Sequence, residues 1–200
     1  MYLKLLNDPR LYPLLCRFDD DLAAQVRDGG CDCGDVLHSA SYPRKPRGLV
    51  IPEGDDCRRH SFCCARDGCR ARSTPPSVRF LGRRVYFGVV VTLMSAMNHG
   101  ASPRRVHELR AKVGADRRTL SRWRAWWREE FVTTTTWRAS RGRLMPTVAE
   151  DKLPSSLLDR LGGGLTGLCR ALGFLLPLTT TESCSVMPGF DPQKMLVALR

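Results

Sequence analysis

The 200-residue chain has little acidic charge in its centre and no long apolar run. Residues 58–143 contain 5 Asp or Glu against 20 Lys or Arg, a net charge of +15, while the two flanking segments together carry −3. The longest apolar stretch, residues 165–178, is broken by Arg170 and Pro177 and falls short of a membrane span. The N-terminal apolar run is short and interrupted by charges, unlike a signal peptide. We therefore expect a cytoplasmic protein that contacts no membrane.

Motifs typical of zinc enzymes are also absent from the sequence. It contains no HExxH and no His-x-Glu followed by Pro-Cys-x-x-Cys. The few carboxylates after Arg143 lie where no strands are predicted that could hold a two-metal nuclease centre. We therefore expect a protein that is not an enzyme and has no catalytic residues. The uneven positive charge instead indicates a polyanionic partner, and nucleic acid is the commonest polyanion that a basic protein meets.

Nine cysteines are present, an odd number that argues against a complete disulfide framework. In a reducing compartment, this many cysteines favour metal binding or burial. Two pairs lie beside glycines that suit tight turns, and thiolates from two such turns can surround a Zn²⁺ ion tetrahedrally with no open position. We therefore predict a structural zinc ribbon whose ligands are Cys31, Cys33, Cys64 and Cys69.

The spacing of these cysteines departs from the usual ribbon, in which about two residues separate the members of each pair. Here one residue separates the first pair and four separate the second. Four other side chains therefore stay open as substitute ligands: Cys57, Cys63, His38 and His60. Buried free thiols are the alternative to a metal site.

Residues 102–131 predict two helices that meet at Gly114. Ser102 suits an N-cap, so the first helix should run from there to about residue 112. Gly114 can take the positive φ of a sharp turn, and Asp116 can cap the second helix. An apolar stripe at spacings of three and four residues predicts the buried face of that helix: Leu120, Trp123, Trp127 and Phe131. The pattern is typical of a helix-turn-helix.

The remaining faces of the second helix carry side chains that can donate to phosphates and to guanine in a major groove. They are Arg117, Arg118, Thr119, Ser121, Arg122 and Arg124. An extended basic arm is predicted to follow, with three arginines placed to meet phosphates: Arg138, Arg141 and Arg143. We therefore predict sequence-specific binding of duplex DNA. The alternative is a solvated basic face on an ordinary helical hairpin.

The predicted fold is mainly α, with a small N-terminal zinc ribbon followed by a helix-turn-helix domain of three helices. The third helix is assigned to residues 83–97, where β-branched side chains leave a strand as the alternative. The aspartates at 19–21 are interpreted as a solvated cap. Along the chain we expect a helical lead-in at 1–29, a zinc-ribbon-like region at 30–76 ending in a linker at 74–76, the helix-turn-helix at 77–132, the basic arm at 133–149, C-terminal helices at 150–178 and a disordered tail at 179–200.

The segment from Cys31 to Phe131 resembles bacterial transposase-like and insertion-sequence-associated proteins. It combines the cysteine turns, the sequence TPPSVRFLGRRVY and a helix-turn-helix that ends in SRWRAWW, and it covers about half of the chain. In such proteins, the ribbon and the helix-turn-helix recognise the ends of a mobile element, and a separate nuclease domain cuts them. The resemblance therefore implies a DNA-binding protein that acts with a separate transposase or nuclease subunit.

Two other functions are compatible with the same residues. One is a transcriptional regulator of the same architecture, and the other is a zinc-ribbon module whose basic face meets RNA or another protein. The leucines of residues 150–178 predict packing on the helical bundle or on a second copy of the chain, so a homodimer also stays open. Binding of duplex DNA no better than heparin would favour the interaction module.

Overall fold

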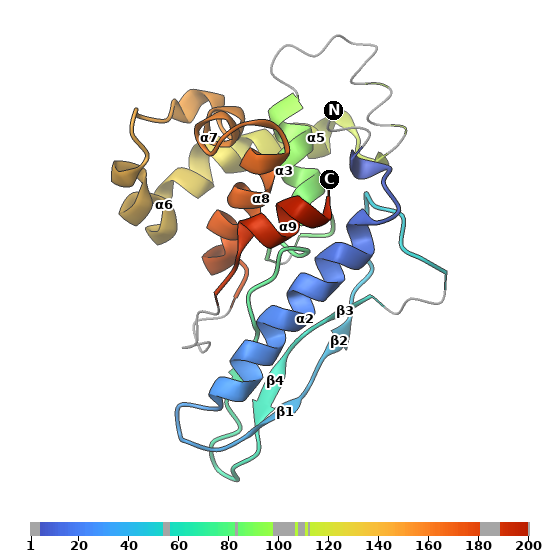
Figure 1. Ribbon diagram of the computed structural model, residues 1–200, viewed down its shortest axis with the longest axis vertical. Coiled ribbons are helices and arrows are strands. Elements are labelled where there is room, and N and C mark those ends of the chain that lie inside the picture. The colour runs from blue at the N-terminus through green and yellow to red at the C-terminus, as the bar shows by residue number, and fades with distance from the viewer. Residues whose placement is uncertain are drawn as a thin grey trace.

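The computed structural model shows a mainly helical protein with two small antiparallel sheets (Figure 1). The helices form a wide upper body, while the strands and the C-terminal half of the long helix α2 (Leu11–Gly29) form a narrow lower end. Among the described residues, no helix has both the length and the apolar character needed to cross a membrane. The structure describes residues 5–53, 57–82, 84–97, 107, 111, 113–180 and 189–199.

Helix α2 connects the two ends of the molecule. Its apolar side chains recur every three or four residues, so they line one face of the helix. Leu11 and Leu15 enter the main core, whereas Ala23 and Val26 pack against the strands at the lower end. The helical lead-in predicted from the sequence is therefore present from Leu11 to Gly29.

The strands form a short antiparallel ladder in two parts. In the lower part β1 pairs with β4, which also pairs with β5, and in the upper part β2 pairs with β3. The register places Leu37 opposite Cys64, so the turns that carry the two cysteine pairs lie at the same end of the ladder. The bounds are β1 Leu37–Ser39, β2 Tyr42–Pro43, β3 Arg58–Arg59, β4 Phe62–Cys64 and β5 Arg72–Ser73.

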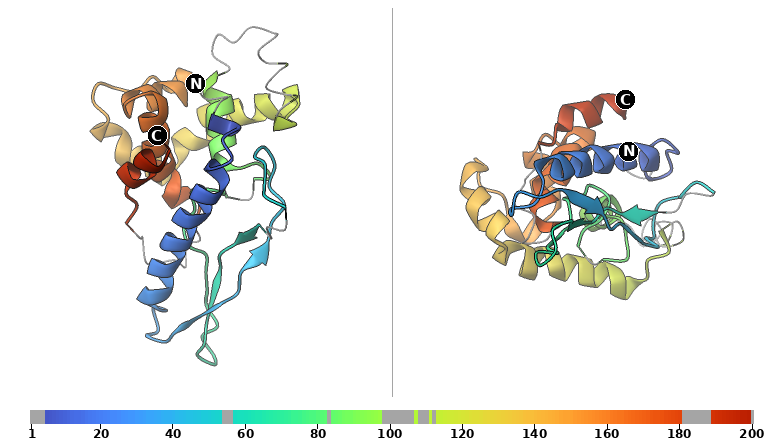
Figure 2. Two further views of the ribbon diagram at one scale, coloured as in Figure 1. Left: turned by 45° about the vertical axis from the view of Figure 1, so that its right-hand side comes forward. Right: turned by 90° about the horizontal axis from the view of Figure 1, so that it is seen from below.

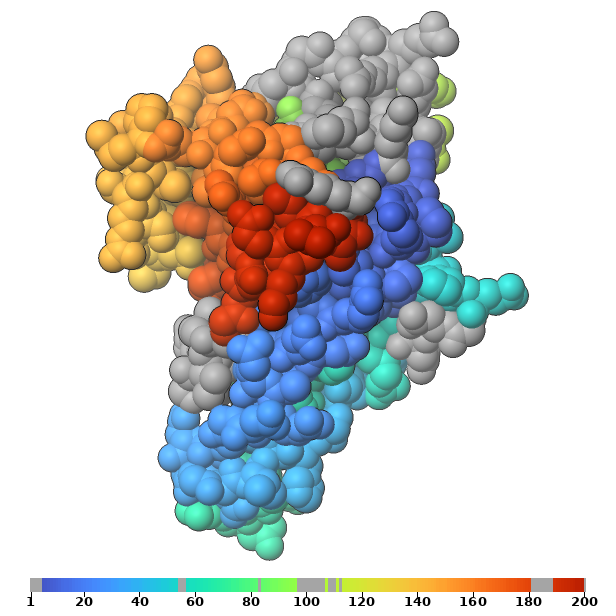
Figure 3. All heavy atoms as spheres, viewed as in Figure 1, coloured from blue at the N-terminus to red at the C-terminus, as the bar shows by residue number. Residues whose placement is uncertain are grey.

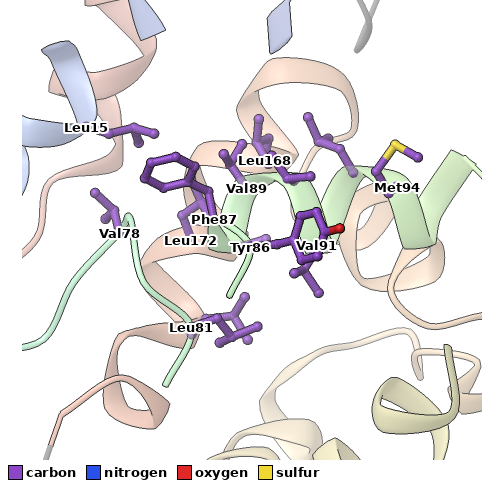
Figure 4. Close-up of a cluster of buried hydrophobic side chains, with 14 of the residues drawn as sticks. Leu15, Val78, Leu81, Tyr86, Phe87, Val89, Val91, Met94, Leu168 and Leu172 are labelled. Atoms are coloured by element: carbon purple, nitrogen blue, oxygen red, sulfur yellow. The ribbon is translucent and has the colours of Figure 1, made fainter. Parts of the chain in front are cut away.

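Helix α3 (Gly88–Met97) lies at the centre of the upper body, and the predicted third helix is therefore confirmed over these residues. Val89, Val90 and Val91 are all 0% exposed, so the helix is covered on every side that they face. The strand alternative is wrong because the valines pack in three directions at once, as the helical spacing requires. Figure 4 shows side chains from α2 and from the C-terminal helices around this segment.

The predicted second helix is α5 (Arg117–Ala125), which continues as a π-helical turn, η1 (Trp126–Glu130), and a 3-10 turn, η2 (Phe131–Thr133). Asp116 caps it as predicted, since its carboxylate accepts from the Thr119 amide. All four stripe residues are buried. The first helix expected at residues 102–112 lies outside the described residues except for two helical positions, so the complete helix-turn-helix stays a prediction.

The extended basic arm expected at residues 133–149 is wrong. The segment contains helix α6 (Thr135–Ser140) and a 3-10 turn, η3 (Arg141–Arg143). Thr134 caps α6 through a hydrogen bond from the Trp137 amide to its hydroxyl oxygen. Trp137 then packs against both Phe131 and Phe174, with ring centroids 5.1 and 6.3 Å away. The threonine-rich sequence has no apolar period, yet it forms a capped helix that Trp137 anchors to the core.

The leucine-rich segment is helical and packs on the bundle of the same chain. It comprises η4 (Glu150–Lys152), α7 (Ser155–Arg160), α8 (Gly164–Leu175) and η5 (Leu176–Leu178), and α7 and α8 both contact α3. The disordered tail expected from residue 179 is wrong for α9 (Pro192–Ala198), which Asp191 caps. Met195 and Leu196 are buried, and α9 lies beside α2 in Figure 3. Residues 181–188 lie outside the described part of the chain.

A buried ion pair joins α2 to the segment before α3. The Asp19 carboxylate accepts from the Arg79 guanidinium at 2.7 Å, the Ser77 hydroxyl at 2.5 Å and the Val78 amide at 2.8 Å. Burial opposes the charge of Arg79, but the Asp19 carboxylate outweighs it and raises the pKa of Arg79. The interpretation of the three aspartates as a solvated cap is therefore wrong for Asp19, which is 1% exposed. The linker expected at 74–76 is likewise not free, because Pro75 and Pro76 are buried and the residues that follow, Ser77 to Arg79, supply the partners of Asp19.

Three further hydrogen bonds extend this buried network. The Arg79 guanidinium donates to the carbonyl oxygen of Arg58 in β3 at 3.0 Å. Arg59 donates to the carbonyl oxygens of Pro75 and, at 2.8 Å, of Thr179, which follows η5. The network thus ties α2, β3 and the end of the C-terminal helices to one segment.

We expect Asp19→Ala to destabilise the protein by about 3–5 kcal/mol, because it leaves a buried guanidinium without its counter-charge. The matched control is Asp21→Ala, which removes an exposed carboxylate two residues away and should change the free energy of unfolding by less than about 0.5 kcal/mol. Urea unfolding followed by circular dichroism measures both. Equal stability of the two variants would contradict the role given to Asp19.

Candidate functional site

The four predicted cysteine ligands lie together at the lower end of the molecule. The sulfurs of Cys31, Cys33, Cys64 and Cys69 are all within 4.8 Å of one another. Cys31 and Cys69 are 3.8 Å apart, and Cys33 and Cys64 are 3.4 Å apart, too far for a disulfide of about 2.05 Å. A Zn–S distance of about 2.3 Å implies sulfur separations of about 3.8 Å across a tetrahedron. The cluster therefore has the size of a four-thiolate metal site.

The first pair sits on a tight turn after α2. The Gly34 amide donates to the Cys31 carbonyl at 2.7 Å, and the Cys31 amide donates to the Asp35 carbonyl at 2.9 Å. Gly34 has a φ of +85°, a conformation that favours glycine. A hydrogen bond from the Asp35 backbone to Cys33 lowers the pKa of that thiol to about 7. The turn therefore prepares one sulfur as the thiolate that metals bind.

The second pair uses a longer turn between β4 and β5. Cys64 ends β4, and the Cys69 amide returns to the Arg66 carbonyl at 3.2 Å. The Arg66 amide points at the Cys64 sulfur, 3.4 Å away. Burial raises the pKa of Cys64 to about 12, so this thiol needs a bound cation to ionise near neutral pH. Four intervening residues suit the pair because the turn brings Cys69 back toward the end of the strand.

The substitute ligands considered in the sequence are not part of the cluster. In the part of the chain that the structure describes, the four cysteines form the one group of this kind. Cys63 alternates with Cys64 along β4 and its sulfur faces the Arg70 carbonyl at 3.6 Å. His60 hydrogen-bonds Asp20 at 2.8 Å, and Cys57 lies in the main core. His38 is paired with Cys63 in the ladder, so it too lies off the cluster.

The basic side chains predicted on α5 divide into two groups. Arg117, Arg118, Ser121 and Arg122 are exposed. The prediction of an exposed donor is wrong for Thr119, which is 7% exposed and whose hydroxyl oxygen accepts from Arg122 at 3.1 Å. The prediction is only partly right for Arg124, because its side chain is half-buried. Burial lowers the pKa of its guanidinium. Thr119 precedes Leu120 and Arg124 follows Trp123, so both lie next to the buried stripe. At 3.6 residues per turn, their side chains point partly toward the core.

The three arginines of the expected arm are exposed on α6 and η3 instead of on an extended segment. Arg141 forms an ion pair with Glu150 at 3.4 Å, and the same carboxylate accepts from the Trp137 indole at 2.9 Å. Arg141 therefore already has an anionic partner. Arg138 and Arg143 stay exposed as candidates for phosphate contacts.

Sequence reasoning missed the contact between Trp126 and Arg84. The Arg84 guanidinium lies over the Trp126 ring, 4.3 Å from its centroid. These two side chains line a pocket of about 390 Å³ together with Leu81, Gly82 and Leu178. They lie 42 residues apart in the sequence, in segments that are predicted separately. No sequence signal connects them.

The chain matches no family model, and neither the curated proteins nor the solved structures contain a significant match to it. Support for the candidate site therefore comes from the residues and geometry of this chain alone.

We expect Cys64→Ser to lower the amount of metal that copurifies with the protein, since one of four sulfur ligands is lost. The matched control is Cys63→Ser, which changes the neighbouring thiol on the other face of β4 and should leave the metal content unchanged. Metal analysis of protein purified without chelator measures both. Equal metal content in wild type, control and Cys64→Ser would rule out this cluster as the ligand set.

Proposed function

We propose that the protein binds duplex DNA through helix α5 and that a zinc ion held by the four cysteines stabilises its lower end. The observation that carries the proposal is a basic solvent face, with Arg118, Ser121 and Arg122, on a capped helix. The opposite face is fixed by Leu120 and Trp123, each 4% exposed. A rigid helix with exposed donors suits a major groove, where arginine can bond the acceptor edge of guanine in a bidentate manner.

The local geometry before α5 supports this proposal. Val113 is helical, Gly114 has a φ of +67°, and Asp116 caps the next helix. A glycine turn followed by a capped helix is what the second half of a helix-turn-helix requires. In the described part of the chain, no carboxylate lies within ion-pair distance of Arg117 or Arg118. Their charge is therefore open to phosphates.

Zinc is the proposed ion because four thiolates in a tetrahedral set prefer soft or borderline metals, and structural zinc sites of this kind are closed. The small core beneath the cluster consists of Ala23, Val26, Leu37, Phe62 and Cys64. So few apolar side chains contribute little stability, and bound metal adds the rest. The proposed zinc is therefore structural.

The order of cysteine turns and basic helix supports a role in transposition, in which a separate transposase or nuclease subunit would act on the bound DNA. This part of the proposal rests on the resemblance in the sequence. A transcriptional regulator with the same DNA-binding surface is the second candidate, and the sequence bound in a selection from random duplexes, compared with nearby mobile-element ends, separates the two.

We expect Arg118→Ala to weaken binding to the preferred duplex by about 1–3 kcal/mol and to relax its specificity, if Arg118 reaches a base edge. Arg160→Ala on α7 is the matched control, because it removes one exposed arginine from another element. Affinities for the selected duplex and for random duplexes measure the difference. An identical loss of affinity on every sequence would mean that α5 contacts DNA only through its charge and reads no bases.

We expect chelation of the metal to unfold the lower end and leave the upper body folded. The lower end depends on a small apolar cluster, whereas the upper body has an extensive core of its own. Hydrogen exchange with and without chelator should show increased exchange in residues 31–39 and 62–73, with α3 and α8 protected. Unchanged exchange in these residues after complete metal removal would contradict a structural role for the ion.

A further inference from the structure

We propose that the loop of residues 43–47, between the two cysteine turns, forms a second phosphate-binding surface beside α5. Its occupant would be the sugar-phosphate backbone of the same DNA duplex, next to the groove that α5 enters. This inference rests on the proposed function and adds the exposed side chains of Lys45 and Arg47 to the binding surface.

Arg44 fixes the loop to the segment before α3. Its guanidinium donates to the Arg84 carbonyl oxygen at 2.8 Å and lies over the Phe80 ring, 5.4 Å from the centroid. Arg44 is therefore a structural anchor of the loop. The two basic residues that follow it at alternate positions, Lys45 and Arg47, are both exposed, while Pro46 between them is buried.

The backbone directs Arg47 toward α5. Arg47 pairs with Tyr86 in a parallel bridge. The Arg47 amide donates to the Val85 carbonyl at 2.9 Å, and the Arg47 carbonyl accepts from the Phe87 amide at 3.2 Å. Bridge partners project their side chains to the same side. Tyr86 reaches the turn before α5, since its hydroxyl donates to the Gly114 carbonyl at 2.9 Å and its ring lies 4.9 Å from that of Trp123. Arg47 is thus on the side that faces this turn.

A second contact places the loop at the same turn. A Cβ atom on Gly48 would lie 3.2 Å from a methyl carbon of Val113, the residue that precedes Gly114. The loop and the start of α5 are therefore neighbours, although about 70 residues separate them in the sequence. In the right-hand view of Figure 2, α2 lies between α9 and the strands, and α5 lies beyond the strands on the side away from α9.

The loop of residues 43–47 and α5 contain basic but no acidic residues. Burial, reinforced by the nearby Arg122, lowers the pKa of Arg84, while Glu130 acts in the opposite sense. Asp116, the acidic residue at the start of α5, is engaged as the helix cap. Clustered arginine and lysine repel one another, and phosphates relieve this repulsion when they replace condensed counter-ions. A DNA backbone provides regularly spaced phosphates, which suits basic groups on two adjacent elements.

The test compares three double variants, each of which removes two positive charges: Lys45→Ala with Arg47→Ala in the loop, Arg118→Ala with Arg122→Ala on α5, and Arg17→Ala with Lys194→Ala on α2 and α9. The last pair is the control, since both residues are exposed and lie on elements other than the loop and α5. Affinity for the selected duplex and for random duplexes is measured across a salt series, and circular dichroism verifies that each variant is folded.

We expect the loop variant to weaken binding on every sequence alike, by on the order of tenfold or more near physiological salt, and to lower the salt slope by roughly two units. Its preference for the selected sequence should persist, because phosphates carry no sequence information. The control should match wild type within a factor of about two in affinity, since its charges lie on elements outside the proposed surface.

The outcomes separate the two proposals. If the α5 variant loses binding while the loop variant binds like the control, the loop inference is wrong and the proposed function stands. If wild-type protein binds no duplex, or if all three variants lose affinity equally, both are wrong. A loop variant that loses sequence preference together with affinity would also overturn the inference, because the loop would then read bases.

Discussion

The buried ion pair between Asp19 and Arg79 fixes the relation of the two ends of this molecule. Asp19 belongs to α2, which reaches the cysteine cluster, and Arg79 precedes the segment that carries α3 and contacts α5. Charges so deeply buried are stable only when they are paired and hydrogen-bonded, and both conditions are met here. A shift of α2 along its axis would break these bonds, so the pair sets the position of the helix.

Both candidate surfaces depend on this frame. The end of α2 leads into the Cys31 turn, and β4 supplies Cys64 from the opposite side of the ladder. The segment that holds Arg79 continues through Arg84 and Tyr86, whose side chains contact Trp126 and Trp123 beneath the basic face of α5. The proposed zinc therefore stabilises one end of a rigid body whose other end presents the proposed DNA surface. The loop of residues 43–47 joins them, since it leaves the ladder and ends at α5.

The local sequence predicted features that depend on neighbours in the chain. The capped second helix and its buried face followed from Asp116 and from apolar spacing, and the four cysteines with their glycines indicated the metal cluster. The same reasoning failed where a single contact overrides a weak local pattern. Trp137 anchors a helix in the threonine-rich segment, and Met195 and Leu196 hold α9 on the core. Composition alone cannot reveal such anchors, because their binding partners are remote.

The sequence by itself therefore determined the helices with strong apolar periods, the excess of positive charge and the chemical nature of the ligands. Tertiary structure alone decided which aspartate is buried, that no substitute ligand joins the four predicted cysteines, and where the basic loop lies relative to α5. Asp19 and Asp21 are the same residue type, yet only Asp19 lies on the face of α2 that meets Arg79. The loop that carries Arg47 meets the turn before α5 because Arg47 pairs with Tyr86, which bonds Gly114, and because Gly48 lies near Val113. Helical spacing is a property of adjacent residues, whereas these contacts arise only when distant segments share one core.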